Sequence, residues 1–420
     1  MGARERLDSA LQAIAARNAE WRIVTALDED GARAAAGQSD ARRAAGQSLG
    51  PLDGALVAVK DNIAVAGLPW TAGLAHWKGR IAARDAEAVS RLRRAGAVIL
   101  GTVNMHEGAL GATTDNPVYG RCANPRDPAR TPGGSSGGSA AVISAGWADA
   151  ALGTDTMGSV RIPAAYCGVF GLKPTIGAVP HDGLTALSPS LDTIGPLARN
   201  LPLLSAMQNV LADPPGRASG PARLAEVVGL PVQLSQVTLE PEIATAYKRA
   251  QIAAEALGLA IRPIDLTGWE PDRARRGGLM LTEAEGAVAL ADAMQSQEGM
   301  SATLRALLQF GADLSSARLV EALARIRRSA RAADRAFGEV DLLMMPTAPQ
   351  RAFPHGRDAP ANQADLTALA NFAGLPALSL PVGAEGLPAA VQLVGPRHAE
   401  AQLLDVAARL APILHVKGSP

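Results

Sequence analysis

Helix-forming segments alternate with short apolar runs along most of this chain. Residues 85–95 place Val89 and Leu92 on one helical face and end at a glycine, and the apolar run 97–100 follows directly. Residues 319–337 repeat apolar side chains every three or four positions, and arginines fill the other faces. Helices that alternate with strands in this way pack as a sheet covered by helices. The sequence therefore predicts an α/β fold, with the arginines on a solvated helix face.

Further elements follow from the same patterns. They are strands at 55–59, 260–264 and 342–345, helices at 3–16 and 30–45, and a mainly helical region from 230 to 300 beside the sheet. Residues 213–222 are rich in Pro, Gly and Ala, which indicates a surface crossover. Lys60 directly follows the first of these strands. Because chemistry gathers at the carboxyl ends of strands in such sheets, Lys60 is a candidate functional residue.

The composition limits the kinds of partner that we expect. The 420 residues include 40 basic and 40 acidic side chains, so the net charge is zero and predicts neither nucleic-acid nor membrane binding. The two cysteines, Cys122 and Cys167, favour a reducing compartment. The first 14 residues carry charges that a signal peptide lacks, and the best candidate for a membrane span, 140–152, is short and contains Asp149. These features predict a cytoplasmic protein with a small, neutral or modestly charged partner.

Two segments rich in glycine and hydroxyl groups, 133–139 and 153–163, suit acyl transfer. A serine is a weak nucleophile until a base takes its proton, and the carbonyl oxygen that it attacks becomes an anion that needs N–H donors. Glycine leaves backbone N–H groups uncovered, and the serines and threonines supply hydroxyls. Both requirements of the chemistry can therefore be met in these two segments.

Other interpretations of these segments fit less well. A phosphate-binding loop would need lysine where Ser139 stands. Residues 133–137 match the nucleophile elbow of α/β-hydrolases, but the proline-broken segment 124–132 is unsuited to the strand that must precede an elbow. None of the six histidines has a spacing that indicates catalysis or metal binding. We therefore expect no metal and no cofactor, and a base other than histidine.

Three separated segments, 59–61, 133–139 and 153–175, resemble the amidase signature enzymes, which hydrolyse carboxamides with a Ser-Ser-Lys triad. Shorter likenesses lie at 101–105, 190–196, 373–377 and 392–395. The resemblance implies a single α/β domain over residues 1–420, with a large mixed β-sheet between layers of α-helices. Its expected parts are N-terminal helices at 1–50, a catalytic core at 51–200, a variable, mainly helical pocket-shaping segment at 213–340 and a C-terminal return to the core at 341–415.

Carried onto this chain, the resemblance places the nucleophile on Ser159 and a bridging serine on Ser135, after a cis peptide from Gly134. The base is Lys60, whose burial would lower its pKa and leave a neutral amine. The implied oxyanion donors are the backbone N–H groups of Thr156, Met157, Gly158 and Ser159. The implied supporting residues are Thr154 and Ser136 near Lys60, Asp155 and Arg161 as an ion pair, and Gly134.

Met157 departs from the family pattern, in which glycine usually stands at this position. Methionine with positive φ would be strained. We therefore expect an ordinary backbone conformation at Met157 and a side chain that lines the acyl pocket.

The resemblance implies an amidohydrolase that cleaves a small carboxamide through an acyl-enzyme, with a small-molecule substrate, no cofactor and a possible homodimer. An alternative is a glutaminase-like subunit of a tRNA-dependent amidotransferase, which needs a partner protein. A catalytically silent binding protein would lack part of the triad, whereas Lys60, Ser135 and Ser159 are all present. The candidate substrates, which differ in acyl group and amine, are small aliphatic amides, malonamate-like compounds, ureido acids and aryl amides.

Overall fold

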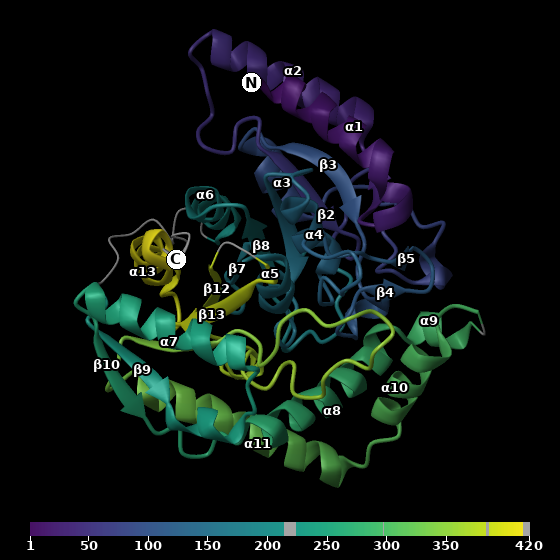
Figure 1. The fold of residues 1–420 in the computed structure, drawn as a ribbon. Coiled ribbons are helices and arrows are strands. Elements are labelled where there is room, and N and C mark those ends of the chain that lie inside the picture. Colours follow the sequence, from purple (N-terminus) through teal and green to yellow (C-terminus); the bar gives the residue numbers. More distant parts are fainter. Residues whose placement is uncertain (214–223, 297, 384–385, 415–420) are drawn as a thin grey trace.

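The computed structural model describes residues 1–213, 224–296, 298–383 and 386–414, and it shows one large mixed sheet flanked by helices (Figure 1). The strands are β1 (Val24–Leu27), β2 (Leu56–Lys60), β3 (Val98–Val103), β4 (Asp115–Asn116), β5 (Gly120–Arg121), β6 (Ala150–Thr154), β7 (Phe170–Lys173), β8 (Ile194–Ala198), β9 (Val227–Pro231), β10 (Ala260–Ile264), β11 (Leu342–Pro346), β12 (Ala377–Val382) and β13 (Ala389–Val394). The helices are α1 (Ala3–Trp21), α2 (Glu29–Ala44), α3 (Glu87–Arg94), α4 (Gly137–Ser144), α5 (Arg161–Cys167), α6 (Leu201–Leu211), α7 (Pro241–Ala256), α8 (Pro271–Ala289), α9 (Ala291–Gln295), α10 (Ala302–Ala312), α11 (Ser316–Ala336), α12 (Ala368–Phe372) and α13 (Glu400–Leu414).

Eleven of the described strands form the sheet in the order β1-β3-β2-β6-β8-β7-β12-β13-β11-β9-β10. The pairs β3/β2, β2/β6, β11/β9 and β9/β10 are parallel, and the other neighbours are antiparallel. The short strands β4 and β5 pair separately. The fold class predicted from the sequence, a mixed sheet between helical layers, is confirmed.

Strand β2 shows why the central strands are apolar on both faces. Val57 and Val59 join a buried cluster with α3, α6 and α13, whereas Leu56 and Ala58 join a second cluster with α1, α2 and α4. Strands covered by helices on both faces need such continuous apolar runs. Side chains alternate between the two faces along a strand, so Lys60 lies on the same face as Leu56 and Ala58. This is the face of the sheet that α4 covers.

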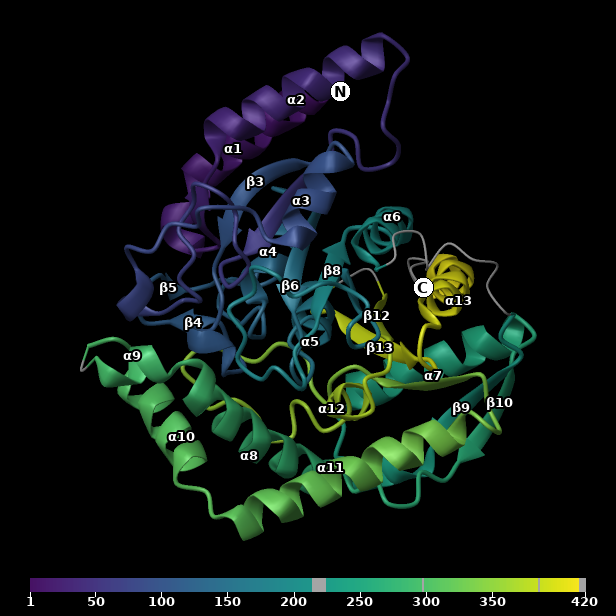
Figure 2. The ribbon, with the colours of Figure 1, turned by 180° about the vertical axis from the view of Figure 1, so that it is seen from behind.

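Helices α1 and α2 lie side by side at one end of the molecule, over β3, and α8 to α11 lie at the opposite end (Figures 1 and 2). Helices α8 and α11 belong to a third apolar cluster, which joins Leu281 of α8 to Leu343 of β11 and to Met157. This cluster fixes the helical region against the same part of the molecule that carries the 153–163 segment. The variable region can therefore shape a pocket there.

Most elements predicted from the sequence are confirmed within a few residues at their ends. The predicted strands at 55–59, 260–264 and 342–345 correspond to β2, β10 and β11, and the opening helices to α1 and α2. The predicted run 97–100 corresponds to β3, and helix α1 continues to Trp21, past its predicted end. The strands that the sequence analysis did not predict are β1, β4, β5, β6, β7, β8, β9, β12 and β13. Apart from Asp213, the predicted crossover lies outside the described residues. No helix in the described part of the chain is long and apolar enough to cross a membrane.

Gly101 provides a test of how β3 packs between β1 and β2. It has a φ of 147°, and a Cβ there would lie 2.1 Å from the carbonyl oxygen of Ala26 in β1. We predict that Gly101→Ala lowers the free energy of unfolding by about 1–3 kcal/mol, because strand β1 must move. The measurement is urea denaturation followed by circular dichroism.

The control is Gly37→Ala within α2, where a Cβ meets no atom within 4 Å. Alanine there should stabilise the helix by about 0.5–1 kcal/mol. Equal unfolding midpoints for the two variants would contradict this account of β3.

Candidate active site

Lys60 and Ser135 meet at the carboxyl ends of two adjacent parallel strands. Lys60 ends β2 and is fully buried, and its Nζ donates hydrogen bonds to Ser135 Oγ at 2.8 Å and to Thr154 Oγ1 at 2.7 Å. Thr154 ends β6, and Ser135 immediately precedes the turn into α4. The structure thus brings together two residues of the implied triad and one of its supporting residues.

The surroundings of Lys60 change its ionisation. Burial removes water from the ammonium and lowers the pKa of Lys60 to about 7, although the nearby Asp192 and Asp155 carboxylates oppose the shift. A lysine with this pKa is a neutral amine in a large fraction of molecules at neutral pH. Lys60 can therefore accept a proton where an ordinary surface lysine cannot.

Gly134 and Ser135 are joined by a cis peptide bond, as the resemblance implied. A Cβ on Gly134 would lie 2.8 Å from the carbonyl oxygen of Gly111, so only glycine fits at this close approach of two loops. The carbonyl oxygen of Ser135 accepts a hydrogen bond from the His106 N–H at 3.0 Å. These contacts place the Ser135 hydroxyl next to Lys60.

The histidine rings of the described residues make no hydrogen bond to either serine of the triad. His106 is the nearest candidate, but its Nδ1 accepts a hydrogen bond from the backbone N–H of Thr114 at 3.1 Å. Burial lowers the pKa of His106 to about 4, so its ring is neutral. Within the described chain there is also no group of three His, Cys, Asp or Glu side chains that could hold a metal ion.

Ser159 lies between β6 and α5 and lines a cavity of about 380 Å³. Its carbonyl oxygen accepts a hydrogen bond from the Ser136 N–H at 3.2 Å, while Ser136 Oγ donates to the Thr154 carbonyl oxygen at 3.1 Å. Ser136 therefore ties the Ser159 segment to β6. The described residues show no hydrogen bond between the Ser159 and Ser135 hydroxyls, and such catalytic contacts often tighten only in the substrate complex.

Asp155 holds the loop that carries Ser159. Its carboxylate accepts hydrogen bonds from the N–H groups of Gly158 at 2.7 Å and Val160 at 3.1 Å, and from both Nε and Nη2 of Arg161 at 3.0 Å. Both ionic side chains are fully buried. Burial alone would raise the pKa of Asp155, but the charges of Arg161 and Lys173 hold it well below its usual range. The predicted ion pair between Asp155 and Arg161 is thus buried in the protein interior.

The hydrogen bonds of this loop correct the predicted set of oxyanion donors. The Gly158 N–H already donates to Asp155, so this geometry does not support Gly158 as an oxyanion donor. Gly158 has a φ of 129°, which turns its N–H toward the carboxylate. In the described structure, by contrast, the N–H groups of Thr156, Met157 and Ser159 have no protein acceptor. The N–H groups of Thr156, Met157 and Ser159 stay predicted donors.

Three residues from the C-terminal part hold Arg161 and were missed by the sequence analysis. Arg161 donates to Gln392 Oε1 at 2.8 Å, to Asn371 Oδ1 at 2.6 Å and to the Thr367 carbonyl oxygen at 2.9 Å. Thr367 Oγ1 in turn donates to the Met157 carbonyl oxygen at 2.7 Å. Gln392 lies within the apolar strand β13, and a lone amide in such a strand is a sequence signal that could have been used.

Asp192 is a further buried carboxylate near the site that the sequence analysis missed. It accepts hydrogen bonds from Thr156 Oγ1 at 2.6 Å and from the N–H groups of Leu187 and Ser188. Burial raises the pKa of Asp192 above its usual value. Asp192 therefore fixes the side chain of Thr156, whose own N–H is one of the predicted oxyanion donors.

The cavity beside Ser159 is formed by the catalytic core and the helical region together. Met157, Ile162 and Leu187 line it from the core, and Leu279 and Leu307 line it from α8 and α10. Further lining residues are Gly134 and the polar residues Thr156, Arg275, Thr282, Glu283 and Gln363. Met157 is not among the residues with positive φ, so its predicted backbone conformation is confirmed, and its side chain meets α8 at Gly278.

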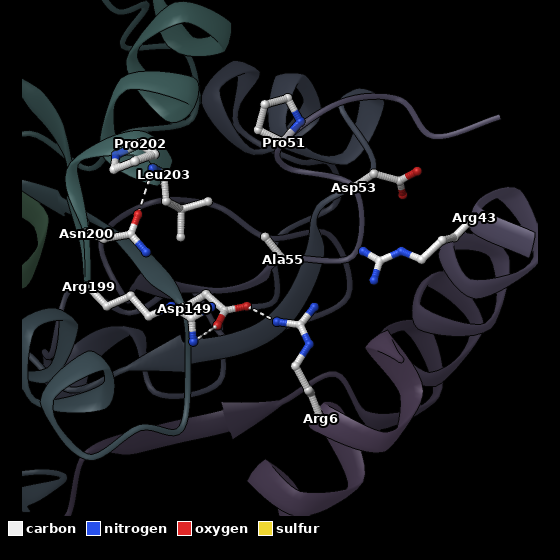
Figure 3. A pocket seen from close by; sticks show the side chains of 10 residues that line it. All are labelled: Arg6, Arg43, Pro51, Asp53, Ala55, Asp149, Arg199, Asn200, Pro202 and Leu203. Atoms are coloured by element: carbon white, nitrogen blue, oxygen red, sulfur yellow. Dashed lines mark hydrogen bonds and ion pairs between the residues drawn. The ribbon is translucent and has the colours of Figure 1, made fainter. Parts of the chain in front are cut away.

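A second cavity, of about 360 Å³, lies at the other end of the parallel strands (Figure 3). Ala55 and Asp149, which precede β2 and β6, line it, whereas Lys60 and Thr154 end the same strands. Asp149 is paired there with Arg6 and Arg199. This cavity is therefore separate from the residues around Ser159.

Comparison with known proteins identifies the family. The chain belongs to the amidase signature family, because the family model described as Amidase matches residues 5–404. It is thus an amidase-family hydrolase that acts on carbon–nitrogen bonds. A solved structure described as a crystal structure of amidase has a TM-score of 0.89 and 32% sequence identity, and the match covers 99% of this chain and 96% of that one.

Relatives of similar length are components of a larger enzyme. One of them, a subunit of the glutamyl-tRNA(Gln) amidotransferase of Synechococcus sp. (strain RCC307), is 36% identical over 96% of this chain and 93% of the relative. The corresponding protein from Thermus thermophilus, which has the same name, is 39% identical over 85% of this chain and 84% of the relative.

These relatives overturn the partners predicted from the sequence, which were a small-molecule amide, no nucleic acid and a possible homodimer. The relatives are each named as one subunit of an amidotransferase whose name includes a tRNA. The prediction failed because it rested on a net charge of zero. Net charge describes the field of the whole chain, and a subunit interface depends on local surface instead.

The buried ion pair allows a direct test. We predict that Asp155→Asn lowers the free energy of unfolding by about 3–5 kcal/mol, because Arg161 is left as an uncompensated buried charge. Urea denaturation measures this loss.

The matched control is Asp8→Asn, which breaks an exposed pair with Arg33. This change should cost less than about 1 kcal/mol. If the two substitutions cost the same, Asp155 does not hold the loop as described.

Proposed function

We propose that this chain is the amide-hydrolysing, glutaminase-like subunit of a tRNA-dependent amidotransferase. The observation that carries the proposal is the likeness to one subunit of such an enzyme, which extends over 96% of the chain at 36% identity. A cavity of about 380 Å³ beside Ser159 supports it, because a cavity of this size suits a compact amide. A tRNA-dependent enzyme of this kind acts in the cytoplasm, which is a reducing compartment. The two free, buried cysteines agree with this location.

The proposed reaction begins with proton transfer along Lys60, Ser135 and Ser159. The neutral amine of Lys60 takes the proton of the Ser135 hydroxyl, 2.8 Å away, and Ser135 takes that of Ser159. Ser159 Oγ then bonds to the amide carbon. The N–H groups of Thr156, Met157 and Ser159 stabilise the resulting oxyanion, and each donor contributes about 10²- to 10³-fold in rate.

The second half of the reaction returns the protons. The C–N bond breaks, the relay delivers the Ser159 proton to the leaving nitrogen, and ammonia departs from an ester between Ser159 and the acyl group. Water then loses a proton to the same relay and attacks the ester. The products are a carboxylate and free Ser159, and the ammonia would pass to a partner subunit.

The remaining residues have positioning roles in this proposal. Thr154 accepts a hydrogen bond from Lys60 and thereby orients its amine. Ser136 and Gly134 place the two serine segments, while Asp155 and Arg161 fix the Ser159 loop. These groups do not touch the reacting atoms, so their loss should reduce the rate less than loss of the triad.

The base assignment predicts a definite pH dependence. Because the pKa of Lys60 is lowered to about 7, the amine becomes protonated as the pH falls through that value, and acyl-enzyme formation should decline with it. The rate should level off well above pH 7. Rapid-mixing measurement of ammonia release over a pH series tests this.

Two variants separate Lys60 from other titrating groups. Lys60→Arg keeps a permanent positive charge and Lys60→Ala removes the base, so both should depress acylation at every pH while the circular dichroism spectrum is unchanged. Full turnover by Lys60→Ala would show that another group is the base.

The assembly predicts dependence on partners. Glutamine hydrolysis by the purified chain should be slow and should rise by about tenfold or more when the other amidotransferase subunits of the same organism and the charged tRNA are added. Ser159→Ala is the control and should release no ammonia under either condition. The proposal fails if the chain alone hydrolyses other amides efficiently, ignores glutamine and does not respond to those subunits.

A further inference from the structure

A lone buried carboxyl lines the cavity that contains Ser159. Glu283 of α8 is 7% exposed, and no described residue donates a hydrogen bond to it or forms an ion pair with it. Glu285, two residues further, instead accepts hydrogen bonds from Ser188 and Ser190. This carboxyl reaches the cavity but has no protein partner, so a ligand in the cavity can supply one.

The position of Glu283 on α8 directs it to the cavity. Arg275, Leu279, Thr282 and Glu283 follow the spacing of one helical face, and all four line the cavity. Apolar residues of the core and of α10 complete the wall near them. Burial among such groups raises the pKa of Glu283 to about 7, so a cationic ligand would favour its ionised form.

Arg275 is the other charged residue that lines the described cavity, and its charge is already compensated. Its Nε donates to Asp365 and its Nη2 donates to Asp272, both at 2.6 Å. Among the described residues that line the cavity, Glu283 is therefore the one charged residue whose charge no neighbouring side chain compensates. A cavity with this charge favours a substrate that brings a positive group.

We propose that Glu283 binds an ammonium group on the acyl part of the substrate and so selects amides of amino acids. The inference rests on the proposed function, for which the ammonium is the α-amino group of glutamine. Glu283 is the residue that recognises this α-amino group. Glu283 is then a specificity-determining residue that touches the substrate away from the bond that is cleaved.

The experiment compares L-glutamine with the monoamide of glutaric acid, which has the same chain without the amino group. Binding to the Ser159→Ala variant is measured by calorimetry, so that turnover is not needed. A charge-assisted hydrogen bond to the ammonium should make glutamine bind about 10- to 100-fold tighter than the monoamide. Equal binding of the two compounds overturns the inference without any change at Glu283.

Glu283→Gln, added to Ser159→Ala, should remove this preference by weakening glutamine and leaving the monoamide unchanged. The matched control is Glu339→Gln, which makes the same change at an exposed site after α11 and should keep the preference. Equal weakening of both compounds by Glu283→Gln indicates a structural role and overturns the inference. A preference that survives Glu283→Gln also overturns it.

The same measurements separate this inference from the proposed function. If asparagine and the monoamide of succinic acid show the Glu283-dependent preference while glutamine does not bind, the glutaminase proposal fails and the role of Glu283 is supported. If the assembled enzyme hydrolyses glutamine and Glu283→Gln changes neither binding nor KM, the role of Glu283 fails and the glutaminase proposal stands.

Discussion

The Asp155 carboxylate is the contact on which the organisation of the site depends. It accepts hydrogen bonds from the loop that carries Ser159 and compensates the charge of Arg161, which is itself held by Gln392 and Asn371. One buried anion therefore connects the end of β6, the start of α5 and two C-terminal segments. Because a buried charge is tolerated only when paired, these segments must be in place together.

Burial in the same part of the protein interior also determines the pKa of Lys60, at the end of β2. Lys60 is neutral enough to act as a base because burial outweighs the attraction of Asp192 and Asp155. Neither carboxylate pairs directly with Lys60, because Asp155 is committed to Arg161 and Asp192 accepts hydrogen bonds from Thr156 and nearby N–H groups. A direct ion pair would keep the ammonium charged and would remove the base.

The sequence predicted what depends on local pattern and missed what depends on distant contacts. Lys60 could be placed because an apolar strand ends there, and the resemblance located both serines. The direction of the Gly158 N–H depends on a backbone angle that no residue type determines. Gln392 lies 231 residues from its partner Arg161, so its lone amide in an apolar strand indicates a buried polar contact but not the partner. The partners were missed because net charge says little about a local interface.

The wide separation of these contacts along the chain also has a consequence for biosynthesis. Strands β12 and β13 lie in the interior of the sheet, next to β7 and β11, although they are the last two described strands along the chain. Until they leave the ribosome, Arg161 lacks Gln392, and the sheet is split into two separate halves. A nascent polypeptide therefore has an incomplete sheet until both strands are made, and a product truncated before them would be left for chaperones and proteases.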